Sequence, residues 1–306
     1  MGEPWRNTPH WRIVDLLSES CGRDVGALLL HADTERLTRT DNAQIATFAL
    51  EMVVLDALTT AVGPLSPAVC AGHSLGEYAA LTAAGVLSPG DAGRLVAERG
   101  AAMAETVRLA PGTMTVLIAP GVARTASSLA ARLRAEDGAQ VWVANVNGPD
   151  QAVVSGTAEA VAALAARAAG DGARAVGIAV GGAFHTPMMT PAGPRLAAAV
   201  ARAPLHRARC PVIANVDARA RRGDAATWRE LMVRQLVLPV RWSDSMRTLA
   251  GMAERGPGGP LRLVELGPGS TLTGLARRLL PPHLQVRPVA TPAEVDALAA
   301  EWWPRP

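Results

Sequence analysis

A serine stands between two glycines in residues 72–76 (Gly-His-Ser-Leu-Gly), after a short apolar run and before a helical pattern. This order of strand, turn and helix is typical of a nucleophile elbow, in which the glycines permit a turn sharp enough to project the serine. The helix directs its amino terminus at the serine, so backbone N–H groups beginning with that of Leu75 can stabilise an oxyanion. We therefore predict nucleophilic catalysis by Ser74. The alternative is a glycine-rich turn that exposes a serine without a catalytic role.

A serine nucleophile requires a general base, and the chain contains six histidines. His73 adjoins Ser74, but because neighbouring side chains diverge around such a turn, we expect it not to reach the hydroxyl. His185 lies just past an apolar strand, where a parallel α/β sheet presents its functional groups, and we predict that it is the base. The remaining histidines have no catalytic context: they are His10, His31, His206 and His283.

The elements that must hold these residues alternate between strands and helices, which predicts an α/β core with a mainly parallel sheet. Residues 113–181 differ, because their predicted order, β-α-β-β-α-β, is that of a ferredoxin-like unit. Helices are predicted over 41–61, 77–84, 89–107, 122–134, 158–169, 191–202, 227–238, 243–254 and from 271, and strands over 68–71, 113–119, 141–147, 152–155, 173–180, 212–215 and 261–266, with one more strand and helix after 281.

The expected fold is α/β: a large, α/β-hydrolase-like parallel-sheet domain with an inserted ferredoxin-like small subdomain. We place the small subdomain at residues 112–182. The large subdomain is then built from two parts of the chain, residues 1–111 and residues 183–306.

Composition excludes several classes of protein. Apolar residues make up 49% of the chain and charged residues 19%, with a net charge of +3, which rules out a disordered chain. All 30 basic residues are arginine, which we attribute to codon usage in a GC-rich genome. The three cysteines are far apart and lack a Cys-x-x-Cys spacing, so we expect neither a disulfide framework nor a metal site, and a cytoplasmic location.

Neither a membrane nor a nucleic acid is an expected partner. The amino terminus lacks the apolar core of a signal peptide, and no uninterrupted, uncharged apolar run reaches the roughly 18 residues that span a bilayer. A cluster of arginines could meet an acidic protein or a phosphorylated ligand, or be a solvated basic face; it lacks the interleaved aromatic residues of a nucleic-acid platform. The cluster consists of Arg202, Arg207, Arg209, Arg219, Arg221 and Arg222.

Six short motifs in a fixed order resemble the malonyl-CoA:acyl-carrier-protein transacylase family, which includes the acyltransferases of polyketide synthases. The likeness runs over roughly residues 1–280. The motifs are Gly72-His73-Ser74-Leu75-Gly76-Glu77-Tyr78, Glu98-Arg99-Gly100, Asn145-x-Asn147, Gly182-Ala183-Phe184-His185, Val233-Arg234-Gln235-Leu236 and Glu265-Leu266-Gly267-Pro268-Gly269.

The resemblance implies roles for four residues. An acyl thioester would acylate Ser74, while His185 would take the hydroxyl proton and later activate the thiol of the carrier protein. A backbone carbonyl orients the histidine in this family, and the matching position is Gln235. Arg99 matches the arginine that holds the free carboxylate of malonyl, a task suited to a planar guanidinium, which pairs a carboxylate bidentately.

The resemblance also bears on substrate selection. It implies that His73, Asn145 and Asn147 belong to the substrate site, although the two asparagines would equally suit a strand end before a Gly-Pro turn. Leu75 and Phe184 match the residue types that accompany malonyl rather than methylmalonyl, because a phenylalanine fills the space that a 2-methyl branch needs. Such steric selection is worth only about 1–3 kcal/mol for a methyl-sized group.

From these implied roles we predict a discrete transferase that loads malonyl from CoA onto an acyl carrier protein in polyketide or fatty-acid biosynthesis. The CoA thioester is a substrate, and no cofactor is expected. Three alternatives stay open: a transferase for another acyl group, which would not need Arg99; a serine hydrolase, which would place its histidine late in the chain; and a non-catalytic module that binds carrier proteins.

The amino terminus departs from the family pattern. Family members open with a strand and a Gly-Gln-Gly-Ser-Gln-type loop whose backbone N–H is the second oxyanion donor. Residues 1–5 (Met-Gly-Glu-Pro-Trp) match the segment just after that loop. We therefore expect an internal start codon, with the first strand and one donor missing, and loss of such a donor costs on the order of 10²–10³ in rate.

Overall fold

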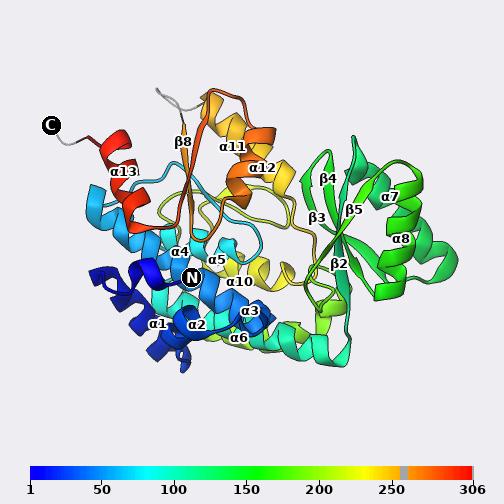
Figure 1. The fold of residues 1–306 in the computed structure, drawn as a ribbon, viewed down its shortest axis with the longest axis horizontal. Helices are drawn as coiled ribbons and strands as arrows, with labels where there is room; N and C mark the ends of the chain where they lie inside the picture. The colour runs from blue at the N-terminus through cyan, green and yellow to red at the C-terminus, as the bar shows by residue number, and fades with distance from the viewer. Residues whose placement is uncertain (256–260, 305–306) are drawn as a thin grey trace.

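The computed structural model describes residues 1–255 and 261–304, which form a mixed α/β protein (Figure 1). Its elements in chain order are η1 (Glu3–Trp5), η2 (Pro9–Trp11), α1 (Arg12–Cys21), α2 (Val25–His31), α3 (Thr34–Thr38), α4 (Thr40–Val62), β1 (Cys70–Ala71), α5 (Gly76–Ala83), α6 (Pro89–Leu109), β2 (Thr113–Ile118), α7 (Val122–Asp137), β3 (Val141–Gly148), β4 (Gln151–Gly156), α8 (Ala158–Gly170), β5 (Arg174–Ile178), η3 (Pro187–Ala192), α9 (Gly193–Arg202), β6 (Val212–Ile213), β7 (Ala220–Arg221), α10 (Ala225–Arg234), α11 (Trp242–Arg255), β8 (Arg262–Leu266), α12 (Thr271–Leu279), β9 (Gln285–Val289) and α13 (Pro292–Trp302).

The segment from β2 to β5 forms a four-stranded antiparallel sheet in the order β3-β4-β2-β5, with α7 and α8 packed against it (Figure 1). Side chains alternate across this sheet, as strand geometry requires. Leu117 and Val154 join a hydrophobic cluster drawn wholly from residues 117–173, whereas Val153 packs into the main core of the chain. Both faces of the sheet are therefore covered, one by its own helices and the other by the rest of the protein.

Outside this unit, the strands form two separate small sheets. β1 pairs in parallel with β6, which pairs antiparallel with β7, and β8 pairs in parallel with β9. The sequence predicts one mainly parallel sheet, and the parallel pairs agree with that prediction. They are not joined into one sheet within residues 1–255 and 261–304, because β1 has only two residues before the chain turns into the elbow.

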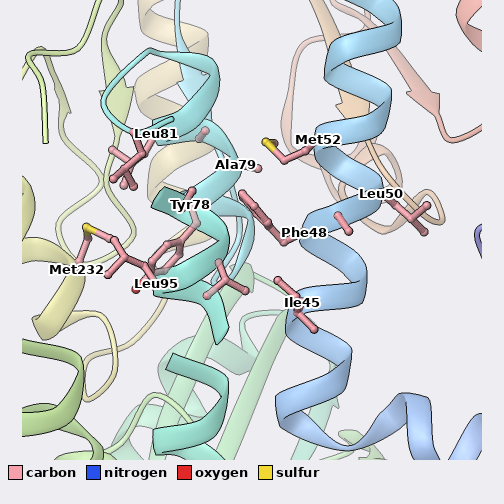
Figure 2. Packing of buried hydrophobic residues seen from close by; sticks show 14 of the residues in the cluster. Ile45, Phe48, Leu50, Met52, Tyr78, Ala79, Leu81, Leu95 and Met232 are labelled. Carbon is pink, nitrogen blue, oxygen red and sulfur yellow. The ribbon is translucent and has the colours of Figure 1, made fainter. Parts of the chain in front are cut away.

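The long helix α4 lies in the centre of the main core. Figure 2 shows Phe48 and Met52 on the side of α4 that faces Ala79 of α5. By length and composition alone α4 could cross a membrane, but 56% of its apolar window is buried inside the protein. Glu51 and Asp56 also interrupt the apolar run, so α4 is the core helix of this fold.

Most predicted elements occur within a few residues of their expected ends, including α6, whose cap Ser88 accepts a hydrogen bond from the Asp91 backbone N–H at 3.1 Å. Three strands are clearly shorter than predicted: β1 covers only 70–71, β5 only 174–178 and β6 only 212–213. After β6 the chain leaves the sheet and places Asn215 past the carboxyl end of the strand, whereas β1 begins two residues later than predicted. Residues 1–39, for which no element was predicted, contain three helices and two 3-10 turns.

Candidate active site

Ser74 lies in the turn between β1 and α5, in a backbone conformation that is unusual for a serine. Its φ is 52°, in the left-handed region, which disfavours residues with a Cβ. The turn is tight enough that a Cβ on Gly72 would collide with the backbone of Gly76. Ser74 Oγ lies 2.7 Å from Nε2 of His185. The glycine pattern thus produces the sharp turn, and the turn aims the hydroxyl at the histidine.

His185 follows β5 and is buried beside the serine. Its Nδ1 donates a hydrogen bond to the backbone carbonyl of Gln235 at 2.8 Å, which leaves Nε2 free to accept the Ser74 proton. Burial, and then the positive charge of Arg99, lower the pKa of His185 to about 3. The imidazole is therefore neutral at physiological pH, the state that a general base requires.

Gln235 contacts three members of the site. Besides its carbonyl bond to His185, its side-chain Nε2 donates to the backbone oxygen of Ser74 at 2.9 Å. Its Oε1 accepts a hydrogen bond from Nη2 of Arg99 at 3.0 Å. One buried glutamine thus fixes the nucleophile, the base and the guanidinium relative to one another.

Arg99 is a buried cation that faces the nucleophile. Its side chain comes from α6, it is 1% exposed, and its Nη2 lies 3.3 Å from Ser74 Oγ. Its other hydrogen-bond partners are neutral amide oxygens of Gln44 and Gln235, and its Nε has no partner. Within residues 1–255 and 261–304, no carboxylate lies at ion-pair distance from it, and burial lowers its pKa. An anionic ligand would supply the missing counter-charge.

The structure places the remaining predicted site residues at different distances from this cluster. His73 points away from Ser74: its Nε2 lies 2.9 Å from Oδ1 of Asn147, its ring packs against Trp242, and burial lowers its pKa. Asn147 therefore reaches the elbow through His73. Asn145 is buried and pairs through its backbone with Val240, and it makes no side-chain hydrogen bond within the described residues.

Leu75 and Phe184 flank the two reacting side chains in sequence. In the first turn of α5, the backbone N–H groups of Gly76 and Glu77 bond to the carbonyls of residues 73 and 74. The N–H of Leu75 has no such acceptor in the described part of the chain, so it can donate to an oxyanion. The Phe184 ring is largely buried and packs so closely on Gly182 that a Cβ there would meet it.

Sequence reasoning missed three residues that hold the site. Gln44 of α4 accepts a hydrogen bond from Nη1 of Arg99. Asn215 bonds to both sides of the elbow, and Glu77 accepts the Asn215 backbone N–H at 2.7 Å. Burial raises the pKa of Glu77 to about 7. Of these three residues, Asn215 could have been suspected from the sequence, because it ends a predicted strand at the sheet edge where functional groups gather.

The arginine cluster is not centred on this site. The Arg209 backbone N–H bonds to the carbonyl of Ala84, and the Arg209 side chain lies over Gly85, at the end of α5 remote from Ser74. Arg221 is paired with Asp217. No group of three or more potential ligands that could hold a metal ion occurs among the residues that the structure describes.

The chain is an acyl transferase domain over most of its length, because a model of that domain family matches residues 11–290. The chain is 37% identical to the malonyl CoA-acyl carrier protein transacylase of Escherichia coli over 266 residues (86% of this chain, 82% of that protein). It is 36% identical to the Bacillus subtilis enzyme of the same name over 269 residues (88% and 81%). The chain belongs to the malonyl-CoA:acyl-carrier-protein transacylase family.

Solved structures of related enzymes agree with this assignment. The malonyl-CoA:acyl carrier protein transacylase of Xanthomonas oryzae superimposes with a TM-score of 0.87 at 37% identity, covering 97% of this chain and 91% of that one. A malonyl-transacylase solved in complex with its type II polyketide synthase acyl-carrier protein gives a TM-score of 0.85 at 33% identity (95% and 91%).

Proposed function

We propose that this protein transfers malonyl from CoA to the phosphopantetheine thiol of an acyl carrier protein, in polyketide or fatty-acid biosynthesis. The observation that carries the proposal is the setting of Arg99, a buried guanidinium without a carboxylate partner among the described residues. It lies 3.3 Å from Ser74 Oγ, which in turn is 2.7 Å from a neutral His185. A nucleophile beside a buried cation with no carboxylate at ion-pair distance among the described residues suits an acyl group that carries its own carboxylate.

The first half-reaction acylates the serine. Ser74 Oγ attacks the thioester carbonyl carbon as His185 Nε2 takes the hydroxyl proton, and the resulting oxyanion accepts a hydrogen bond from the Leu75 N–H. Collapse of this intermediate breaks the C–S bond, and His185 returns the proton to the CoA thiolate. Malonyl remains as an ester on Ser74.

The second half-reaction reverses these roles with a different thiol. The carrier thiol passes its proton to His185 and attacks the acyl-serine carbonyl. A new C–S bond forms, the C–O bond to Ser74 breaks, and the proton returns to Oγ. Because the bond between Gln235 and Nδ1 fixes one tautomer, the same nitrogen serves both halves.

Arg99 selects the substrate in this mechanism. Its planar guanidinium can hold the malonyl carboxylate by two parallel N–H···O bonds, which an ammonium group cannot do. Burial makes this pairing stronger than it would be at the surface. An acyl donor without a free carboxylate gains nothing from the guanidinium, so the site favours malonyl donors over esters in general.

The remaining features are proposals of the same kind. The large subdomain (residues 1–111 and 183–306) is α/β-hydrolase-like, and residues 112–182 are a ferredoxin-like insertion; the strand order β3-β4-β2-β5 and a separate hydrophobic cluster support this division. His73, Asn145, Asn147 and Phe184 contribute to the substrate site. The enzyme works in the cytoplasm without a cofactor.

The test compares acyl donors and acceptors. Purified protein is given malonyl-CoA or acetyl-CoA, with and without a phosphopantetheinylated acyl carrier protein, and acyl-carrier formation and free acid are both measured. We expect malonyl transfer to exceed hydrolysis and to exceed acetyl transfer, and Arg99→Ala to remove the preference for malonyl. Hydrolysis faster than transfer would instead favour a serine hydrolase, and equal rates for both donors would favour another acyl group.

A further inference from the structure

The carboxamide of Asn215 bridges the two sides of the nucleophile turn. Its Oδ1 accepts a hydrogen bond from the Ser74 backbone N–H at 2.7 Å, and its Nδ2 donates to the Gly72 carbonyl at 2.6 Å. Asn215 follows β6, the strand that pairs with β1, and is 1% exposed. The oxygen and the nitrogen of one buried carboxamide thus both form hydrogen bonds, with backbone groups two residues apart.

The turn needs such support because, in the described part of the chain, its Ser74 N–H and Gly72 carbonyl have no backbone hydrogen-bond partner. The left-handed φ of Ser74 is a strained conformation that persists only where the surroundings enforce it, at a cost of about 1–3 kcal/mol. The chain has already left β1, so no strand ladder reaches Gly72 or Ser74. Gln235 holds the Ser74 carbonyl from the other side, but it leaves the Ser74 N–H and the Gly72 carbonyl to Asn215.

The backbone of Asn215 is itself held in place. Its N–H donates to Oε2 of Glu77, which is buried in the first turn of α5. Its carbonyl accepts the backbone N–H of Arg241 at 2.9 Å. The elbow helix therefore fixes Asn215, and Asn215 fixes the elbow, in a closed ring of hydrogen bonds around the serine.

We infer that Asn215 is the positioning residue that holds Ser74 Oγ in line with His185, by clamping the Ser74 N–H and the Gly72 carbonyl across the turn. This inference rests on the proposed acylation of Ser74. An asparagine is required because the clamp needs one acceptor and one donor. An ionised aspartate keeps the acceptor for Ser74 but turns a second negative oxygen toward the Gly72 carbonyl.

Two substitutions test the clamp. Asn215→Ala removes both hydrogen bonds, so we expect Ser74 acylation to slow on the order of 10²-fold, the effect of a misplacement of about 1 Å. The KM for malonyl-CoA should change by no more than about twofold, because Arg99 is untouched. The matched control is Asn42→Ala, which removes another buried carboxamide bonded to the Arg36 carbonyl and to Arg23, and touches neither Ser74 nor His185.

Asn215→Asp adds a pH signature that Asn215→Ala lacks. Only the protonated carboxyl can donate to Gly72, so the ratio of variant to wild-type acylation rate should fall as pH rises, whereas the ratio for Asn215→Ala should stay flat. The charged and titratable groups around this position are Glu77 on α5, Arg99 on α6, Asp217 in the turn after β6, and His185. Division by the wild-type rate at each pH removes their contributions.

Phosphonylation of Ser74 by a fluorophosphonate separates this inference from the proposed function, because the probe reports serine nucleophilicity without using malonyl. We expect Asn215→Ala to slow labelling as much as it slows acylation. If Asn215→Ala reacts as fast as Asn42→Ala after both are corrected for thermal stability, or if the ratio for Asn215→Asp does not vary with pH, the clamp is wrong. If the wild type reacts with the probe but not with malonyl-CoA, the proposed function fails and the clamp is still tested.

Discussion

The Nη2 of Arg99 and the Oγ of Ser74 lie 3.3 Å apart, so a buried positive charge and the nucleophile share one site. A malonyl group has a single methylene between its carboxylate and its thioester carbonyl. A carboxylate held by the guanidinium therefore keeps the reacting carbon close to the hydroxyl. This short distance couples binding of the carboxylate to the chemistry at the serine.

Arg99→Lys should lower kcat/KM for malonyl-CoA by roughly 10- to 10²-fold, although the charge is kept. A lysine ammonium cannot form two parallel bonds to a carboxylate, and loss of one hydrogen bond to a charged group costs about 1.5–3 kcal/mol. Arg94→Lys is the matched control, because Arg94 lies on the same helix, is largely exposed and pairs with Asp91. Steady-state transfer assays with both variants check this, and equal losses would remove the special role of Arg99.

Gln235→Ala should slow acylation by roughly tenfold and raise the KM for malonyl-CoA. The substitution deletes the side-chain bonds to the Ser74 carbonyl and to Arg99, each worth about 1–2 kcal/mol, but keeps the backbone carbonyl that orients His185. Gln285→Ala, at an exposed position of β9, is the control. A loss as large as that of His185→Ala would show that the side chain of Gln235, and not its carbonyl, supports the base.

The rate of acylation should be nearly independent of the protonation of His185 down to pH 5. With a pKa of about 3 the imidazole stays neutral there, whereas an ordinary histidine would be mostly protonated and the rate would fall about 30-fold between pH 8 and pH 5. Single-turnover acylation at both pH values measures this, and a fall of that size would contradict it.

The lowered pKa of His185 also predicts how the stability of the folded protein depends on pH. Because unfolded His185 takes up a proton near pH 6.5 and the folded form only near pH 3, its contribution to the free energy of unfolding is lost as pH falls through that window. His185→Gln should therefore lose less stability than the wild type on acidification.

Glu51→Gln should stabilise the protein increasingly as pH rises from 5 to 8. Burial, and then the charge of Glu265, raise the pKa of Glu51 to about 8, and its Oε2 has no hydrogen-bond partner in the structure. The folded state thus holds a proton that the unfolded state releases near pH 4.5, so this carboxyl costs stability as pH rises through the window. Thermal midpoints at several pH values test this, with Glu19→Gln on the exposed side of α1 as control; a constant difference would refute it.

Phe184→Ser should relax discrimination against methylmalonyl-CoA. If the ring fills the space of a 2-methyl branch, its removal should raise the methylmalonyl to malonyl ratio of kcat/KM by about 10- to 200-fold. Competition assays with both thioesters measure this ratio. An unchanged ratio would mean that Phe184 serves only the core packing that it makes over Gly182.

Much of the fold could be predicted because it depends on local patterns. The helix predicted over 89–107 begins at the first residue of α6, and the order of elements predicted over residues 113–181 is the one observed. Among the amino-terminal helices, α2 and α3 escaped prediction because seven and five residues are too few to show a helical period, whereas α1 was missed although its ten residues carry an amphipathic pattern. The separation of the parallel pairs depends on strand pairing between distant segments, which periodicity does not encode.

Some residues of the site could likewise be predicted from local sequence, and others could not. Ser74 could be predicted from the glycine spacing around it, and His185 from its position after a strand. Arg99 and Gln235 needed the family likeness, because one arginine among thirty has no local signature. Asn215 and Gln44 act through hydrogen bonds to residues far away in sequence. The strand end is a positional signal for Asn215, but only the folded structure reveals the partners of these two side chains.

The most direct measurement is the mass of the intact protein, followed by peptide mapping, after brief exposure to malonyl-CoA. The mechanism predicts one malonyl group on Ser74, absent from Ser74→Ala and discharged when a phosphopantetheinylated carrier protein is added. A folded wild-type protein that stays unmodified, or a malonyl group that maps to another residue and persists in Ser74→Ala, would contradict it.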